Sequence, residues 1–329
     1  MRPSQIKQAI EFAAIKQRRP IFLWGAPGVG KSDTIRQIAK ENKLQLIDKR
    51  MSQADPTELK GYPWPDQEKG VMRFLQDGTL PTKGKGILFL DELNLAPQAV
   101  QAPCYQLILD RQLGEYKLPD GWVVIAAGNR STDRSGVHAM SAALSNRFIH
   151  LDFHPDLEDW LDWAVTNGIS DTTRGYLRYR PKNLHTQDIK PGERAYPTPR
   201  TWAFADTVLN SGLAPEIELE ILKGTIGEGC AAEIVGFARE ARNLPNIDRI
   251  LLDPDKAPVP ESPSTQYAIV SALETKTSVS NFGQIAKYVA RLPKEFEVMF
   301  MQTMARRDDA FCETSTMTGW LRENRSVLI

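Results

Sequence analysis

Residues 25–32 of this 329-residue chain read Gly-Ala-Pro-Gly-Val-Gly-Lys-Ser, which fits the phosphate-loop pattern G-x-x-x-x-G-K-[ST]. The apolar run at 21–24, Ile-Phe-Leu-Trp, is typical of a short buried strand. After the loop, Ile35, Ile38 and Ala39 recur at helical spacing. A chance glycine turn would lack these flanking elements. The stretch therefore predicts strand, loop and helix around the phosphates of a nucleoside triphosphate.

Each part of the loop has a predicted role. Gly28 and Gly30 allow backbone N–H groups to turn inward at the positive end of the helix dipole. Lys31 is expected to reach the β- and γ-phosphates, and Ser32 to ligate Mg²⁺. The residues predicted to bind the nucleotide are Gly25, Ala26, Pro27, Gly28, Val29, Gly30, Lys31, Ser32 and Asp33.

Two carboxylates follow a second apolar run. Residues 86–90 read as a buried strand that ends in Asp91 and Glu92, and open α/β sheets bind ligands at the carboxyl ends of their strands. Asp91 suits the Mg²⁺ shell, and Glu92 suits the polarising of a water for attack on the γ-phosphate. Such a pair is often only a helix N-cap. The phosphate loop upstream favours the catalytic interpretation.

A third apolar run, 122–127, leads into Gly128 and Asn129. An amide at the end of that strand could hold the attacking water between itself and Glu92. On its own this is a weak signal, and it gains weight from the two motifs before it.

Two arginines are predicted at helix ends. Arg147 follows a short predicted helix at 139–145 and precedes a fifth strand at 148–153. Arg200 follows Pro199, which suits the first turn of a helix. Arginine neutralises charge on a transferring phosphoryl group, in its own subunit or in a neighbour.

The order of these motifs resembles that of the AAA+ ATPases over roughly residues 1–245. The segment 52–61, with the insertion that follows it to Pro81, is similar to the MoxR branch. The resemblance implies ATP and Mg²⁺ as cofactors. It also implies a homo-oligomeric ring, usually a hexamer.

By the same resemblance, three residues act with the phosphate loop. Asn129 would be the sensor 1 residue, Arg147 the arginine finger on the neighbouring subunit's nucleotide, and Arg200 the sensor 2 arginine of the lid. The family's usual Asp before the finger is Asn146 here. Rival interface arginines are Arg111, Arg130 and Arg134.

The expected fold is α/β: a P-loop AAA+ core with a five-stranded parallel sheet flanked by helices, then an α-helical lid and an extra C-terminal helical unit. The core is predicted at 1–153 and the lid at 154–245, with an exposed basic loop at 176–196. Four prolines between 252 and 263 indicate a linker or tight crossover, placed at 246–263. The C-terminal helical unit is predicted at 264–329.

The insertion reads Tyr-Pro-Trp-Pro at 62–65. In the branch that it resembles, a hairpin added to the second helix of the core projects toward the central channel of the ring. Tyr62 and Trp64 are therefore candidates for contact with a polypeptide substrate. The alternative is that prolines and aromatics pack together and stiffen the loop.

Composition limits the class of protein. Hydrophobic content of 41% and charged content of 25% are typical of soluble globular chains. We expect a cytoplasmic protein with no membrane insertion, because no apolar run has transmembrane length and the N-terminus lacks a signal-peptide core. Net charge is +0 with Lys and Arg dispersed, a poor footprint for a dedicated duplex-DNA binder. Three scattered cysteines indicate neither a disulfide framework nor a zinc site.

The sequence thus predicts an ATP-hydrolysing ring protein that remodels or activates a partner protein in the manner of a chaperone. The MoxR resemblance implies a partner with a von Willebrand factor A domain. The competing class is a nucleotide-driven nucleic-acid translocase or loader of the same core, which the near-neutral charge disfavours without excluding. A monomeric P-loop enzyme or kinase is a third class, disfavoured by the candidate trans-acting arginines.

Overall fold

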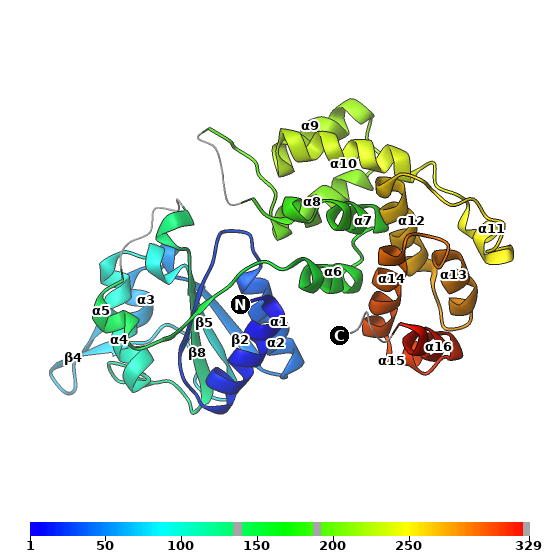
Figure 1. Ribbon diagram of the computed structural model, residues 1–329. Helices are drawn as coiled ribbons and strands as arrows, with labels where there is room; N and C mark the ends of the chain where they lie inside the picture. The colour runs from blue at the N-terminus through cyan, green and yellow to red at the C-terminus, as the bar shows by residue number, and fades with distance from the viewer. Residues whose placement is uncertain (134–139, 187–191, 325–329) are drawn as a thin grey trace. The chain divides into compact units, whose positions relative to one another are not determined.

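The computed structural model describes residues 1–133, 140–186 and 192–324. Its chain falls into two units, Met1–Asp156 and Leu157–Ile329, both traced in Figure 1. The boundary between the units lies close to position 153, where the sequence predicts the end of the core.

The sheet of the first unit has five strands in the order β2-β5-β8-β1-β9, and every neighbouring pair is parallel. The strands are β1 (Ile21–Trp24), β2 (Gln45–Arg50), β5 (Lys85–Asp91), β8 (Gly121–Gly128) and β9 (Ile149–Asp152). This confirms the predicted five-stranded parallel sheet. Because parallel strands end at the same edge, the loops after β1, β5 and β8 meet there.

One face of this sheet is covered by helices from the start of the chain. These are α1 (Pro3–Ile10), the π-helical turn η1 (Glu11–Lys16) and α2 (Lys31–Glu41), and Figure 1 shows α1 and α2 on the same side of the sheet. Their apolar residues form one buried cluster with alternate strand residues such as Ile87 and Phe89. That face is therefore fully packed.

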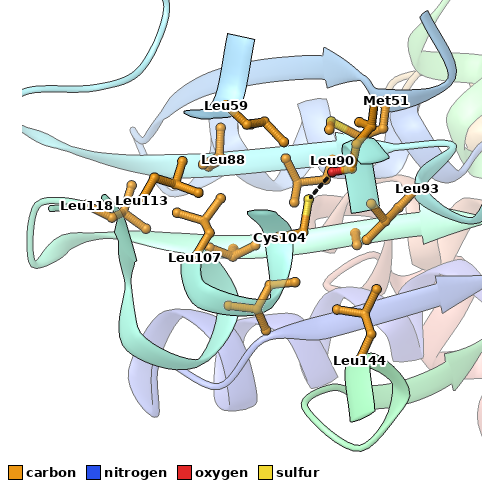
Figure 2. Close-up of a cluster of buried hydrophobic side chains, with 14 of the residues drawn as sticks. Met51, Leu59, Leu88, Leu90, Leu93, Cys104, Leu107, Leu113, Leu118 and Leu144 are labelled. Atoms are coloured by element: carbon orange, nitrogen blue, oxygen red, sulfur yellow. Dashed lines mark hydrogen bonds between the residues drawn. The ribbon is translucent and has the colours of Figure 1, made fainter. Parts of the chain in front are cut away.

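The opposite face carries α3 (Pro56–Lys60), α4 (Gln98–Asp110) and α5 (Ala142–Ser145). The intervening residues of β5, Leu88 and Leu90, join a second buried cluster with these helices, part of which is drawn in Figure 2. Since side chains alternate along a strand, β5 is buried on both faces. This is why it reads as a continuous apolar run in the sequence.

The insertion forms an antiparallel hairpin of β3 (Tyr62–Asp66) and β4 (Val71–Leu75). Gly61 begins it with φ 87°, and a Cβ there would lie 2.7 Å from the carbonyl oxygen of Leu75. A smaller hairpin, β6 (Gln112–Leu113) and β7 (Tyr116–Lys117), follows α4. The 3-10 turns of this unit are η2 (Met51–Gln53), η3 (Leu93–Leu95) and η4 (Ser131–Asp133).

The described residues of the second unit are built from helices. They are α6 (Leu157–Thr166), α7 (Asp171–Tyr179), η5 (Pro181–Leu184), α8 (Pro199–Leu209), α9 (Pro215–Ile226), α10 (Glu228–Ala241), α11 (Ile247–Leu252), α12 (Pro263–Lys276), α13 (Phe282–Val289), α14 (Lys294–Arg307), α15 (Asp309–Cys312) and α16 (Ser315–Glu323). Among the described parts of the chain, no helix combines the length and apolar character needed to cross a bilayer.

The predicted exposed loop at 176–196 is wrong at its start. Helix α7 continues to Tyr179, and the guanidinium of Arg178 is buried against the carboxylate of Glu274 on α12 at 2.6 Å. A buried arginine needs such a partner. Positions 187–191 of the predicted loop, including Lys190, lie outside the described residues.

The predicted linker at 246–263 is partly helical, because α11 occupies its start. Its proline-rich turn is held by α13 and the residues just after that helix. Tyr288 donates its hydroxyl to the carbonyl of Pro258 at 2.7 Å, and Arg291 donates to the carbonyl of Ala257 at 2.8 Å.

Candidate nucleotide-binding and catalytic site

The phosphate loop lies between β1 and α2 at the carboxyl edge of the sheet. Gly28 (φ 76°) and Gly30 (φ 102°) occupy the left-handed region, which favours glycine. A Cβ at Gly25 would lie 3.0 Å from the carbonyl oxygen of Phe153, so the loop also passes close to the end of β9. Because α2 begins at Lys31, the N–H groups of its first turn lie at this loop, as an anion site requires.

Lys31 is buried inside this loop. Its ammonium donates to the carbonyls of Gly25 at 2.5 Å and Ala26 at 3.0 Å. It also donates to the side-chain oxygen of Asn129 at 3.1 Å. The structure therefore brings together the predicted phosphate-binding lysine and the predicted amide at the end of β8.

The two residues predicted to hold Mg²⁺ are in direct contact. Ser32 donates its hydroxyl to Asp91 Oδ2 at 2.6 Å, and the backbone N–H of Glu92 donates to Asp91 Oδ1 at 2.9 Å. No group of three or more His, Cys, Asp or Glu side chains forms a metal cage in the described chain. Mg²⁺ usually takes one or two carboxylates together with phosphates and water. The oxygens of Ser32 and Asp91 fit that ion beside a bound nucleotide.

Glu92 adopts an uncommon backbone conformation, with φ 56°. Its carboxylate accepts a hydrogen bond from the hydroxyl of Ser52 on η2. Sequence reasoning gave no role to Ser52. The sheet register supplies the signal: β2 pairs with β5 so that Arg50 lies opposite Asp91, which makes the residues just beyond these two strands neighbours.

Asn94 is a second residue that no motif marked. It lies on η3, is 2% exposed, and donates its side-chain amide to the carbonyl of Asn129 at 2.7 Å. Asn129 is itself buried. The backbone and the side chain of Asn129 are thus both hydrogen-bonded at this edge.

Arg147 lies just after α5 and is half-buried. Its guanidinium donates to the carbonyl of Ala143 and lies 5.7 Å from the centroid of the Tyr105 ring. Its Nε has no hydrogen-bond partner among the described residues. Its role as the arginine finger stays a prediction.

Two of the rival arginines are held within their own unit. Arg130 donates to Asp152 Oδ1 at 3.1 Å and to the carbonyl of Phe153 at 3.2 Å. Arg111 donates to the carbonyls of Pro119 at 2.9 Å and Trp122 at 2.7 Å. These contacts favour structural roles for both. The third rival, Arg134, lies outside the described residues.

The remaining predicted residues have exposed side chains. Arg200 is exposed on the first turn of α8, in the second unit, and its sensor role stays a prediction. Tyr62 and Trp64 lie on β3 and are 55% and 60% exposed. This exposure disfavours the alternative in which their packing stiffens the loop.

Comparison with known proteins extends these observations. Residues 20–148 match the family described as AAA domain (dynein-related subfamily). Midasin of Giardia intestinalis is 31% identical over 188 residues, which are 54% of this chain and 4% of that protein. The chain thus spans about 4% of the length of this curated relative.

Solved structures show lower similarity. A mutant of RuvB from Thermotoga maritima is 17% identical, with 76% of this chain and 75% of that chain covered and a TM-score of 0.43. NtrX from Brucella abortus in complex with ADP is 16% identical, with 94% and 68% covered and a TM-score of 0.43.

The family match runs from just before β1 to just before β9, so it contains the phosphate loop, the acidic pair and Asn129. These are the residues that the structure gathers at one edge of the parallel sheet. The match to the AAA domain therefore falls on the part of the chain that carries the site, and the predicted resemblance to the AAA+ ATPases is confirmed.

Proposed function

We propose that this chain hydrolyses ATP with Mg²⁺ and, as a ring of the MoxR type, uses the hydrolysis cycle to remodel or activate a partner protein. The observation that supports hydrolysis best is the contact pattern at the carboxyl edge of the sheet. Lys31 donates to Asn129, Ser32 donates to Asp91, and Glu92 is the next residue after Asp91. These are the parts that phosphoryl transfer needs for positioning and charge stabilisation.

In the proposed reaction, Lys31 exchanges its contacts with the loop carbonyls for the β- and γ-phosphates. Mg²⁺, held by Ser32 and Asp91, supplies charge neutralisation when it is bound. Water attacks the γ-phosphorus, the bond from that phosphorus to the bridging oxygen of ADP breaks, and Glu92 takes the proton of the water. Asn129 orients that water.

The proposed ring rests on Arg147, which would reach the nucleotide of a neighbouring subunit. Among the described residues, Arg147 forms no ion pair with a carboxylate and donates to the carbonyl of Ala143. Arg130, in contrast, is paired with Asp152. A hexamer with a von Willebrand factor A-domain partner is what the MoxR resemblance implies, and we place it in the cytoplasm.

The β3–β4 hairpin is the proposed contact with the protein substrate. Its exposed large apolar residues are Tyr62, Trp64, Val71, Met72, Phe74 and Leu75. Pro63 and Pro65 alternate with the two aromatics, and proline has no N–H to donate, so the outer edge of β3 is poorly suited to adding another strand. Contact with a substrate chain would therefore run through the side chains.

The test is an ATPase assay on the purified chain with Mg²⁺ and with EDTA, beside light scattering with a non-hydrolysable ATP analogue. We expect Mg²⁺-dependent hydrolysis and a ring mass in the presence of the analogue. Single- and double-stranded DNA are added in parallel. Retention of DNA with strongly stimulated hydrolysis would favour the nucleic-acid translocase, and a monomer without hydrolysis would reject the proposal.

A further inference from the structure

We propose that Asn94 is a positioning residue for ATP hydrolysis, because its side-chain amide fixes the backbone of Asn129 beside Lys31. This inference rests on the proposed hydrolysis at this site. It assigns Asn94 no contact with the nucleotide, so its effect should pass entirely through Asn129.

The place of Asn94 in the chain makes this contact possible. Asn94 lies on η3, two residues after Glu92, where the chain has just left β5. Strand β5 pairs in parallel with β8, so the segment beyond β5 lies beside the segment beyond β8. The Asn94 amide bridges these two segments with a 2.7 Å bond from Nδ2 to the carbonyl of Asn129.

The end of β8 is held by three hydrogen bonds from neighbouring parts of the site. The backbone N–H of Gly25 donates to the carbonyl of Gly128 at 3.2 Å. Asn94 donates to the next carbonyl, that of Asn129, and Lys31 donates to the Asn129 side chain at 3.1 Å. The phosphate loop and the segment after the acidic pair therefore fix Asn129 together.

The oxygen of the Asn94 amide has no hydrogen-bond partner among the described residues, although its nitrogen donates to Asn129. That oxygen, Oδ1, is buried. Turning the amide over would bring Oδ1 against the carbonyl oxygen of Asn129, where two acceptors repel. An unsatisfied buried acceptor is unfavourable, so the observed orientation follows from the donation to Asn129.

Gly128 provides the space for Asn94. A Cβ at Gly128 would lie 2.1 Å from Asn94 Oδ1, 2.6 Å from its Cγ and 2.9 Å from Cζ of Phe22. All three distances are too short for real atoms, and both neighbours are buried. A side chain at position 128 would therefore displace the Asn94 amide from the end of β8.

Loss of the Asn94 amide should change the rate of hydrolysis more than the affinity for ATP. The phosphate loop keeps its own contacts, whereas Asn129 loses one of the bonds that set its position. A misplacement of about 1 Å at a reacting centre costs about 10²-fold in rate. We expect Asn94→Ala to lower kcat about tenfold to 10²-fold with KM for ATP nearly unchanged.

The decisive experiment is a double-mutant cycle on the full chain with Asn94→Ala, Asn129→Ala and the double variant. If Asn94 acts through Asn129, its substitution should lower kcat in the wild-type background and have little further effect once Asn129 is Ala. Gly128→Ala should reproduce the loss in kcat. If Asn94→Ala does not fold, Asn94→Ser enters the same cycle.

Gln101 supplies a matched control. It is also a buried amide, 3% exposed, and donates Nε2 to the carbonyl of Ala96 at 2.9 Å on the same stretch of chain. Gln101→Ala removes a comparable hydrogen bond that does not involve Asn129. It should therefore lower the melting temperature and leave kcat within about twofold.

Several outcomes would overturn the inference. One is an equal loss of kcat from Asn94→Ala in both backgrounds, and another is an unchanged kcat with only a lower melting temperature. In either case the wild-type chain would still hydrolyse ATP, so the proposed function would stand. A wild-type chain that binds Mg²⁺-ATP without hydrolysing it would overturn both.

Discussion

Glu92 has a strained backbone conformation, and a hydrogen bond fixes its side chain. A non-glycine residue in the left-handed region carries a conformational cost and persists only where its surroundings fix it. Here the backbone N–H of Glu92 bonds Asp91 and its carboxylate accepts from Ser52. This is the arrangement expected of a carboxylate whose position matters more than its contribution to stability.

Replacing Glu92 with Gln tests its chemistry with almost no change in shape. We expect Glu92→Gln to retain ATP binding and assembly and to lose hydrolysis by about 10²-fold or more, because an amide cannot accept the proton of the attacking water. Lys31→Ala is the contrasting variant and should weaken ATP binding itself. Nucleotide affinity and turnover are measured separately. Near-normal turnover of Glu92→Gln would remove Glu92 from the mechanism.

Asp77 gives a residue-scale prediction for pH. Burial raises its pKa, but hydrogen bonds from Lys49 and Thr79 outweigh burial and hold the pKa at about 2. A carboxyl with a lowered pKa stabilises the fold above its unfolded pKa of about 3.9, and this contribution is lost as the pH falls toward the folded value.

The melting temperature of Asp77→Asn should therefore lie below that of the wild type by a constant gap above pH 5, because Asn cannot take the ionised form. The gap should close as the pH falls from about 4 toward 2. Glu68→Gln, an exposed change on the hairpin turn, is the control and should show no such trend. A gap that does not shrink on acidification would contradict the assignment.

At the scale of elements, buried strands were predictable and non-local contacts were not. The apolar runs of β1, β5 and β8 are visible because both faces of those strands are covered. Strand β2, at the sheet edge, carries charged residues and gives no such signal. Helix α7 extends into a predicted loop because Arg178 finds Glu274 far along the chain, a pairing that local sequence cannot show.

In the site, too, local motifs were predictable and contacts between distant segments were not. The phosphate loop and the acidic pair are local patterns, so the sequence alone identifies them. The contacts of Ser52 and Asn94 depend on which strands are neighbours and in which register. They become visible only once β2, β5 and β8 are placed side by side.

The exposed aromatics of the β3–β4 hairpin allow a test of substrate contact. Replacing both Tyr62 and Trp64 with Ala should leave basal hydrolysis and melting temperature nearly unchanged, since both side chains are largely exposed. Partner-stimulated hydrolysis should fall sharply. Phe12→Ala, which removes an exposed aromatic side chain on η1, is the matched control and should leave stimulation intact. A markedly lower melting temperature, with basal and stimulated rates falling together, would instead indicate that the pair stabilises the fold.

At the scale of the whole molecule, a buried arginine connects three helices of the second unit. The guanidinium of Arg178 on α7 bonds Glu274 on α12 and reaches Thr303 on α14 at 3.2 Å. Breaking a buried pair by removing one partner is strongly unfavourable. The helices predicted as a lid and those predicted as a C-terminal unit are therefore packed as one body through these residues.

Assembly into a ring can be tested by mixing two inactive variants. If Arg147 acts on the nucleotide of a neighbouring subunit, Arg147→Ala and Glu92→Gln proteins should each be inactive alone. When they are mixed, activity should return wherever a subunit with intact Glu92 receives an intact arginine from its neighbour. The measurement is ATP turnover against mixing ratio, after exchange of labelled subunits between rings has been demonstrated.

Arg130→Ala is the matched variant in this mixing experiment. Its guanidinium is already bonded to Asp152 and to the carbonyl of Phe153, so its loss should lower stability without abolishing turnover. Arg130→Ala protein could instead prove inactive and regain activity when it is mixed with Glu92→Gln protein. If Arg147→Ala protein regained none in the same mixture, the finger role would pass to Arg130. Normal hydrolysis by Arg147→Ala alone would remove Arg147 from the shared site, because an arginine that completes a neighbour's active site cannot be dispensable for turnover.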